Sequence, residues 1–310
     1  MNSSTVAHVR RPAIGYALYL CASFLFALNG SVSKSLLESG IPAARLSQLR
    51  VTSGFLILLV IVLLTNRQAL RLKRSEIPAL LLYGILGIAM TQFLYFISLQ
   101  YLDIGVALLI EFTAPIMVAL WFRFAKKEKQ NIGVWIALAM ALVGLAMVAQ
   151  VWKGATLNTF GVVAAFGAAV ALMIYYVSAE SLVSKQNSRD PISLTMWGFA
   201  AAALFWAIGQ PWWSFPWEVM GGAVPEGPLA SVPQWALLSY MVVLGTVVPF
   251  LLVLSSMRHI RASQASTIGM SEPVIAAFLA WVLLGEVFLP IQIIGGAIVL
   301  AGVFLAERSR

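Results

Sequence analysis

Long apolar runs recur along the whole chain, separated by short segments that hold most of the charged residues. Each run has about the 20 residues that an α-helix needs to cross the roughly 30 Å hydrocarbon core of a bilayer. Lipid offers the backbone no hydrogen-bond partner, and the period-two alternation of a membrane barrel is absent, so the runs are predicted to be helices. Ten membrane-spanning helices are predicted, at residues 14–37, 43–65, 77–100, 103–125, 131–152, 160–183, 192–210, 233–257, 262–284 and 290–306.

The composition excludes a water-soluble fold. Hydrophobic residues make up 61% of the chain and charged residues only 10%, whereas about 25% of the residues of a soluble domain are charged. The sequence has no phosphate-binding G-x-x-x-x-G-K-[ST] loop and no cluster of His or Cys. We therefore predict an integral membrane protein that is not an enzyme and that binds neither a cofactor nor a metal ion.

Basic residues predict the orientation in the membrane. If the N-terminus lies inside, the inner segments hold 16 of the 20 Lys and Arg residues. Cytoplasmic loops carry such an excess, so both termini are expected in the cytoplasm and the protein in the cell's inner membrane. The net charge of +8 is then explained by loops that lie beside anionic lipid headgroups, and no nucleic-acid partner is needed.

The two halves of the chain are related by duplication. Residues 101–149 align with residues 259–307 at an offset of 158 without a gap, so that Pro115 matches Pro273 and Gly144 matches Gly302. Five helices in each half is an odd number, so the second half must enter the membrane from the opposite face. We predict two inverted repeats, residues 1–155 and 156–310, an organisation typical of secondary transporters.

Three prolines lie inside predicted helices, and each removes one backbone hydrogen bond. Pro249 leaves the carbonyl of Gly245 without its helical donor. Pro115 and Pro273 predict two equivalent bends that could rock during gating. The alternative is a pair of static kinks satisfied by neighbouring helices.

Charged residues within the predicted helices are the first candidates for a binding site, because each costs several kcal/mol to insert unless it is paired or faces water. We hypothesise that Arg50 or Lys34 binds a substrate carboxylate and that Glu111 or Glu272 binds an ammonium group. One of the acids could also carry a coupling proton, because burial favours the protonated form of a carboxyl. The alternative is an Arg50–Glu111 ion pair that only holds helices together.

Polar and amphipathic side chains near the middle of the helices could line a central cavity between the halves. Such residues also form hydrogen bonds between membrane helices, so both interpretations stay open. The candidates are Thr91, Gln92, Tyr95, Tyr175, Ser178 and Trp197.

The run GVALLIEFTAP from Gly105 to Pro115 and the run TIGMSEP from Thr267 to Pro273 resemble the fourth and ninth helices of the EamA family of the drug/metabolite transporter superfamily. Within that family they look like bacterial threonine and homoserine exporters. The resemblance covers essentially the whole chain. It implies ten helices in two EamA repeats and proton-driven export of small metabolites, commonly amino acids, without ATP.

Two other functions remain possible at this point. The first is a polyspecific exporter of aromatic or cationic hydrophobic compounds that uses Glu111 or Glu272 as a cation and proton site. The second is a membrane-embedded scaffold or a lipid-handling enzyme, which would leave the paired prolines and the intramembrane acids without a role.

Overall fold

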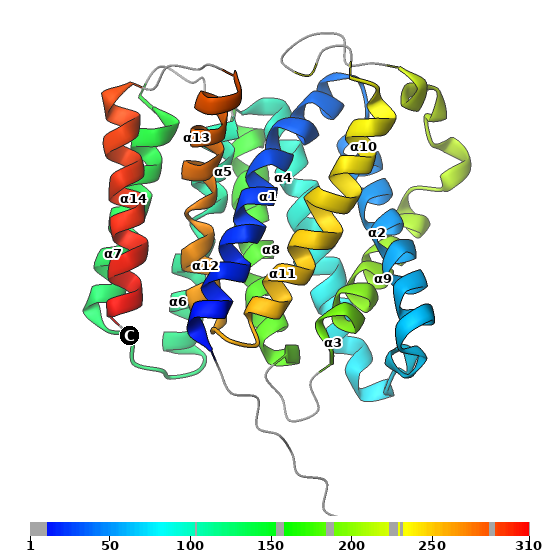
Figure 1. The fold of residues 1–310 in the computed structure, drawn as a ribbon, viewed down its shortest axis with the longest axis horizontal. Helices are drawn as coiled ribbons and strands as arrows, with labels where there is room; N and C mark the ends of the chain where they lie inside the picture. Colours follow the sequence, from blue (N-terminus) through cyan, green and yellow to red (C-terminus); the bar gives the residue numbers. More distant parts are fainter. Residues whose placement is uncertain are drawn as a thin grey trace, which may run out of the picture.

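The computed structural model describes residues 11–309 except 103, 153–157, 184–188, 223–228, 230–231 and 285–288. The described residues form helices and no β-strand, and the longer helices lie side by side in a bundle (Figure 1). The first half contains α1 (Pro12–Glu38), α2 (Ala43–Thr65), α3 (Ile77–Leu81), η3 (Leu82–Ala89), α4 (Met90–Tyr101), α5 (Ile104–Glu111), α6 (Ala114–Phe124) and α7 (Ile132–Ala149). The second half contains α8 (Thr159–Val183), α9 (Pro191–Gly209), α10 (Gln234–Val242), η6 (Val243–Val247), α11 (Val248–Ser256), α12 (Ala262–Gly269), α13 (Glu272–Leu284) and α14 (Pro290–Arg308).

The length and surface of these helices agree with the prediction of an all-helical membrane protein. Within the described residues, seven helices are long and apolar enough to cross a membrane, and the apolar helices at Ile132–Val148 and Pro290–Ala306 are shorter. Large apolar side chains cover the outside of the bundle, as Leu64 and Ile208 illustrate with exposed fractions of 80% and 79%. Such a surface is stable only in contact with lipid.

Helix boundaries follow from local sequence signals. Asn131 and Asp190 cap α7 and α9, because their side chains accept hydrogen bonds from the backbone N–H groups two residues later, at 3.1 Å in both cases. Pro12 and Pro191 occupy first helical positions, where a missing N–H costs nothing. Gly40 has a φ of +97°, which allows the tight turn between α1 and α2.

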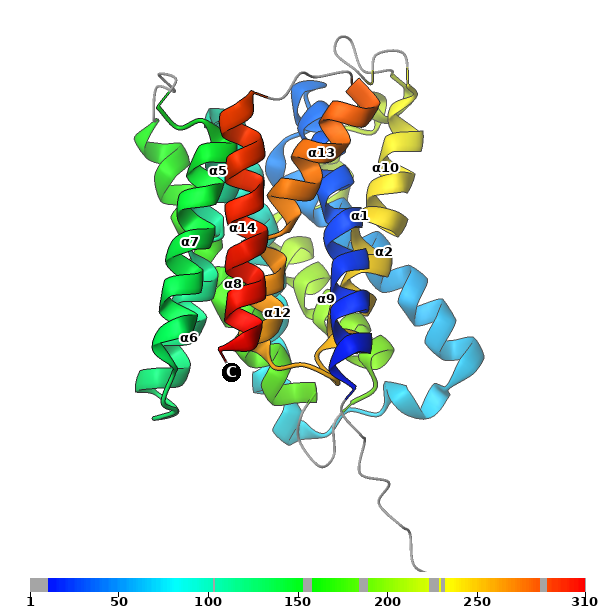
Figure 2. The same ribbon diagram turned by 60° about the vertical axis from the view of Figure 1, so that its left-hand side comes forward.

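Contacts between the helices repeat in the two halves. The first helix of each half packs on the partner half, α1 on α11 and α13, and α8 on α4 and α5. The second helices, α2 and α9, pack on each other, and so do the last helices, α7 and α14 (Figure 2). Each half therefore completes the core of the other.

Two further irregularities occur at equivalent places in the halves. The chain leaves helical geometry at residues 112–113 between α5 and α6, and at residues 270–271 between α12 and α13, positions that the offset of 158 superposes. Pro115 and Pro273 are the second residues of the helices that follow these breaks. In the third helix of each half, a π-helical stretch occurs at the same depth, η3 and η6.

Glycines make matching close contacts in the two halves. A Cβ added at Gly15 would lie 2.7 Å from Ile260, and one added at Gly161 would lie 2.9 Å from Leu102. Leu102 and Ile260 are themselves superposed by the offset of 158. These positions admit only glycine without a shift of the neighbouring helix, and an offset of 146 superposes the two glycines.

The packing of α7 on α14 is a contact between backbones. A Cβ at Gly144 would lie 2.6 Å from the carbonyl oxygen of Gly295, and one at Gly302 would lie 2.8 Å from that of Ala137. Small residues on both helices allow this approach, which membrane helices use because van der Waals contact drives their association.

Arg45 on α2 holds the segment that follows α9 through hydrogen bonds. Its guanidinium donates to the carbonyl oxygens of Pro211 and Ser214 at 3.1 and 3.2 Å and to the Ser214 hydroxyl at 2.6 Å. Nearby on α2, the Gln48 amide donates to the carbonyl oxygen of Gln210 at 2.5 Å. The segment after α9 is thus bound to the second helix of the other half.

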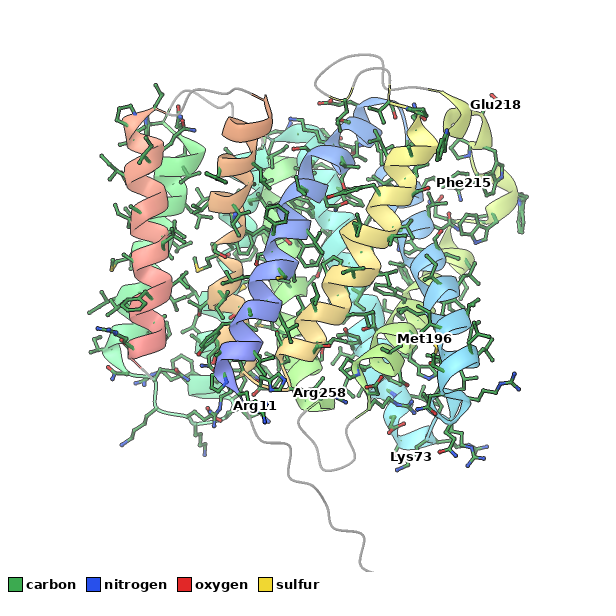
Figure 3. All side chains as sticks on the ribbon, viewed as in Figure 1. Arg11, Lys73, Met196, Phe215, Glu218 and Arg258 are labelled. Atoms are coloured by element: carbon green, nitrogen blue, oxygen red, sulfur yellow. The ribbon has the colours of Figure 1, made fainter. Side chains whose placement is uncertain are left out.

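The two ends of the bundle carry different charged residues. The first residues of α1 and the C-terminal end of α14 lie at the same end (Figure 1). Arg11, Lys73 and Arg258 also lie at that end, and Glu218 lies at the opposite end (Figure 3).

We expect Gly144→Ala to lower the melting temperature of the purified protein in detergent. The new methyl group would collide with the backbone of α14, and overpacking of this kind costs about 1–3 kcal/mol. Gly209→Ala is the matched control, because a Cβ there meets no atom within 4 Å. Equal melting temperatures for the two variants would contradict the close backbone contact between α7 and α14.

Candidate functional site

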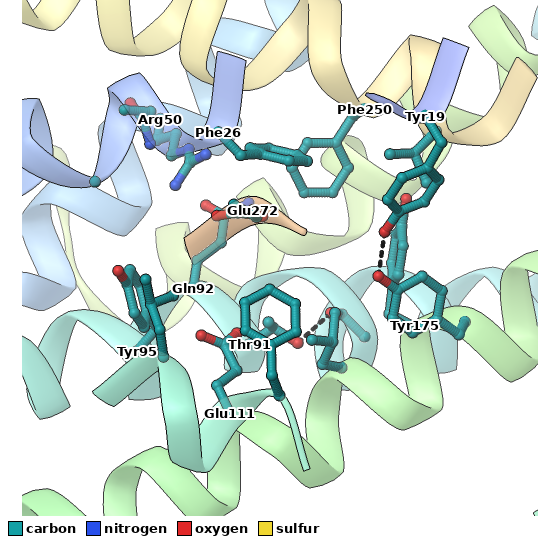
Figure 4. Close-up of a pocket in the computed structure, with 18 residues that line it drawn as sticks. Tyr19, Phe26, Arg50, Thr91, Gln92, Tyr95, Glu111, Tyr175, Phe250 and Glu272 are labelled. Atoms are coloured by element: carbon teal, nitrogen blue, oxygen red, sulfur yellow. Dashed lines mark hydrogen bonds between the residues drawn. The ribbon is translucent and has the colours of Figure 1, made fainter. Parts of the chain in front are cut away.

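A cavity lies in the centre of the bundle between the two halves (Figure 4). Residues of α1, α2, α4 and α5 from the first half line it together with residues of α8, α11 and α13 from the second. The cavity contains one guanidinium and two carboxyl groups, from Arg50, Glu111 and Glu272.

Arg50 is held in place by the second half of the chain. Its exposed fraction is 4%. Its Nε–H donates to the Thr246 hydroxyl, its Nη2 donates to the carbonyl oxygen of Gly245, and its Cζ lies 5.7 Å from the ring centre of Phe96. Nη1 makes no hydrogen bond with the residues that the structure describes, so its N–H groups remain for a ligand in the cavity.

The oxygens that Arg50 binds are available because η6 departs from α-helical geometry. Pro249 has no N–H to donate to the carbonyl of Gly245, four residues before it. The Thr246 hydroxyl donates to the carbonyl oxygen of Met241 at 2.7 Å, which turns its lone pairs towards Arg50. The irregular backbone lies inside the protein, the only place where a membrane protein tolerates it.

Glu111 and Glu272 lie at the two helix breaks. Glu111 is the last residue of α5 and has an exposed fraction of 8%, and Glu272 is the first residue of α13 and is half-buried. Neither carboxyl forms a hydrogen bond or an ion pair with another described residue. Figure 4 shows Arg50 and Glu111 on opposite sides of the cavity, with Glu272 between them.

These groups influence one another through the low-dielectric interior. Arg50 attracts both carboxyls, and the two carboxyls repel each other. With both acids ionised, the site would carry one uncompensated negative charge, which a proton or a bound cation would neutralise. Within the described ranges, no three His, Cys, Asp or Glu side chains come together as a group that could hold a metal ion.

Aromatic side chains form much of the remaining wall. Phe26 meets Phe250 edge to face, with ring centres 5.7 Å apart. The hydroxyls of Tyr19 and Tyr176 hydrogen-bond to each other (Figure 4). This pair closes the cavity beside Gly269, where an added Cβ would lie 3.0 Å from the Tyr19 hydroxyl.

The structure brings seven of the ten sequence-predicted site residues to this cavity, namely Arg50, Thr91, Gln92, Tyr95, Glu111, Tyr175 and Glu272. Lys34, Ser178 and Trp197 do not line it. The Ser178 hydroxyl donates to the carbonyl oxygen of Ile174 within its own helix, and the Trp197 indole donates to that of Ala69 at 3.4 Å.

Arg50 and Glu111 form no ion pair with each other, unlike Glu76–Arg189, Asp190–Arg258 and Glu128–Arg261. In this conformation, Arg50 and Glu111 therefore do not hold helices together through direct contact of their charges. Arg50 instead binds backbone and hydroxyl oxygens.

Sequence reasoning missed six polar or aromatic residues that line the cavity, namely Tyr19, Phe26, Asn29, Phe112, Tyr176 and Phe250. Asn29 is an uncharged amide within a long apolar run, a pattern that could have placed it among the candidates. The aromatic residues carry no comparable signal, because similar side chains face lipid elsewhere on the bundle.

A family model described as the EamA-like transporter family matches the chain twice, at residues 13–150 and 159–308. Since the two matches cover most of the chain, the protein belongs to this family of membrane transporters. This match confirms the resemblance to the EamA family that was inferred from the runs Gly105 to Pro115 and Thr267 to Pro273.

Several relatives of known sequence match most of the chain. The uncharacterized transporter YdfC of Bacillus subtilis is 26% identical over 85% of this chain and 81% of its own length. The threonine/homoserine exporter RhtA of Escherichia coli is 26% identical over 88% of this chain and 84% of its own length. A solved crystal structure covers 96% of this chain and 97% of its own with a TM-score of 0.75 at 18% identity, a likeness of fold.

We expect a cysteine at position 91 to react with a small water-soluble thiol reagent several times faster than one at position 195. Thr91 lines the cavity, whereas Thr195 is fully buried outside it. Both variants are made after Cys21→Ser, which removes the chain's single cysteine. Labelling of Thr91→Cys and Thr195→Cys in membrane vesicles is followed by mass spectrometry, and equal rates would show that water does not reach the cavity.

Proposed function

We propose that this transporter exports small zwitterionic metabolites, amino acids of the threonine and homoserine type, by proton-coupled alternating access across the inner membrane. The observation that carries the proposal is the meeting of Arg50, Glu111 and Glu272 in one cavity between the halves. An amino acid has one carboxylate and one ammonium group, and the cavity offers a complementary charge for each.

Arg50 is the proposed carboxylate site. Its unoccupied Nη1 gives it donors for an anionic oxygen, while Thr246 and the carbonyl of Gly245 fix its orientation. A preorganised guanidinium binds a carboxylate with little loss of side-chain freedom. Lys34, the other basic candidate from the sequence, does not line the cavity and has no part in the proposal.

Glu111 and Glu272 are the proposed ammonium and proton sites. They repel each other in a buried space, so protonation of one of them lowers the energy of the site. Binding of a substrate ammonium removes the same repulsion. Proton and substrate therefore compete for the two carboxyls, which is the condition for exchanging one for the other across the membrane.

We further propose ten membrane-spanning helices in two inverted repeats, residues 1–155 and 156–310, with both termini in the cytoplasm. The equivalent breaks, π-helical stretches and glycine contacts of the two halves support the repeat. The position of Arg11, Lys73 and Arg258 at the end of the bundle that holds the start of α1 and the end of α14 supports the orientation (Figure 1 and Figure 3). Pro115 and Pro273 would then begin the helices that pivot at the two breaks, and Pro249 would maintain the Arg50 site.

The amino-acid substrate class is supported by the relatives. RhtA is a threonine/homoserine exporter and covers 88% of this chain. The first assay compares several amino acids, including threonine and homoserine.

Arg50→Lys is expected to weaken export of threonine about tenfold or more, because an ammonium cannot replace the fork of the guanidinium on Thr246, Gly245 and the substrate. Export is measured as resistance to excess threonine, and as efflux of labelled threonine, in cells without their own exporters. Glu218→Gln, which alters an exposed acid on η5, is the control. Full activity of Arg50→Lys at equal expression would exclude the carboxylate site.

Glu111→Gln is expected to abolish accumulation driven by a pH gradient while exchange of labelled for unlabelled substrate continues. Glutamine resembles the protonated acid in shape and cannot release a proton. Both activities are measured in proteoliposomes, with Glu272→Gln alongside. If pH-driven accumulation persists in Glu111→Gln and is lost in Glu272→Gln, the proton site is Glu272.

The aromatic walls favour a second candidate, a polyspecific exporter of aromatic or cationic hydrophobic compounds. Phe26, Tyr95, Phe112, Tyr175 and Phe250 line the cavity together with the two carboxyls, and aromatic faces attract cations. Inhibition of efflux by organic cations but not by threonine would establish this function in place of amino-acid export.

A further inference from the structure

Gln92 carries an amide group that the charges of the site do not explain. It lies on α4, has an exposed fraction of 5% and lines the central cavity (Figure 4). Neither its Nε2 nor its Oε1 has a hydrogen-bond partner among the described residues. Leaving a buried polar group unpaired is costly, so an unpaired amide that lines a cavity points to a ligand that binds and leaves.

The neighbouring Thr91 differs from Gln92 in this respect. The Thr91 hydroxyl also lies at the cavity, but it donates to the carbonyl oxygen of Gly87 at 2.6 Å and is satisfied within its own helix. The carboxamide of Gln92 is longer and does not turn back on the helix in this way.

A second amide reaches the same cavity from the first helix. The Oδ1 atom of Asn29 is buried without a partner. A Cβ added at Gly245 would lie 2.1 Å from this oxygen, so Asn29 is seated against the bare backbone of η6. α1 and α4 contact each other, and both amides face the space that Arg50, Glu111 and Glu272 surround.

We propose that Gln92 and Asn29 form a subsite for an uncharged hydroxyl on the substrate's side chain. This inference rests on the proposed export of amino acids and adds the selection among them. The charged groups account for the carboxylate and the ammonium, which all amino acids share. A hydroxyl both donates and accepts, and two amides offer both an acceptor and donors for it.

The proposed subsite distinguishes threonine from valine, in which a methyl group replaces the hydroxyl at nearly the same volume. Valine would leave both amides without a hydrogen-bond partner on the substrate. Sites built to hydrogen-bond a substrate group reject analogues that lack it far more strongly than apolar pockets reject a change of one methyl. We expect the native protein to prefer threonine to valine by about tenfold or more.

Gln92→Met tests the subsite, because methionine keeps the length of the side chain and removes both polar atoms. Initial transport rates of labelled threonine and labelled valine at low concentration are measured in proteoliposomes. The expected result is a fall of the threonine-to-valine ratio to near one, through slower threonine transport, faster valine transport or both. Ser178→Ala is the matched control, since Ser178 bonds only within its own helix, and it keeps the native ratio.

The outcomes separate this inference from the proposed function. If the native protein transports neither amino acid, amino-acid export itself is wrong and the subsite falls with it. If the native protein transports threonine and Gln92→Met keeps the native ratio, only the subsite is wrong.

A second pair of measurements covers failure of Gln92→Met to fold. Threonine is expected to raise the melting temperature of the native protein more than valine does, and Asn29→Leu is expected to reduce that difference. Equal stabilisation of the native protein by both amino acids would overturn the proposal.

Discussion

Inside a membrane every backbone carbonyl needs a donor from the protein, and this requirement shapes the centre of the molecule. Pro249 deprives the carbonyl of Gly245 of its helical partner, and the Arg50 side chain takes that place. The same contact gives a buried guanidinium the oxygen partners without which it could not be inserted. The missing N–H of Pro249 therefore leaves a carbonyl that receives its donor from Arg50 and that stabilises the buried guanidinium. The same contact fixes a positive charge at the interface of the two halves.

The two acids face a different situation. Arg50 is tied to oxygens of the second half, whereas Glu111 and Glu272 have no protein partner among the described residues and lie where the helices are interrupted. A charge with fixed partners gives a site its geometry. Groups without partners can change protonation or ligand, and these two lie beside the two interruptions of the helical backbone.

Much of the fold could be predicted from the sequence, because lipid constrains run length and backbone hydrogen bonding so strongly. The offset of 158 superposes not only Pro115 and Pro273 but also the helix breaks before them. The orientation of each helix about its axis could not be predicted, since the runs are apolar on every side. For this reason Ser178 was expected at the cavity and Tyr19 was not, although both are polar residues within apolar helices.

The anchoring of α2 has a consequence for how the molecule can divide when it moves. Arg45 and Arg50 attach α2 at two heights to backbone of the second half, and α2 also packs along α9. In the same way α8 of the second half packs on α4 and α5 of the first. The first and second halves of the sequence are thus not two rigid bodies that can move apart from each other. Any rigid body that rocks must therefore combine helices from both halves. The two duplicated repeats cannot move as two separate units.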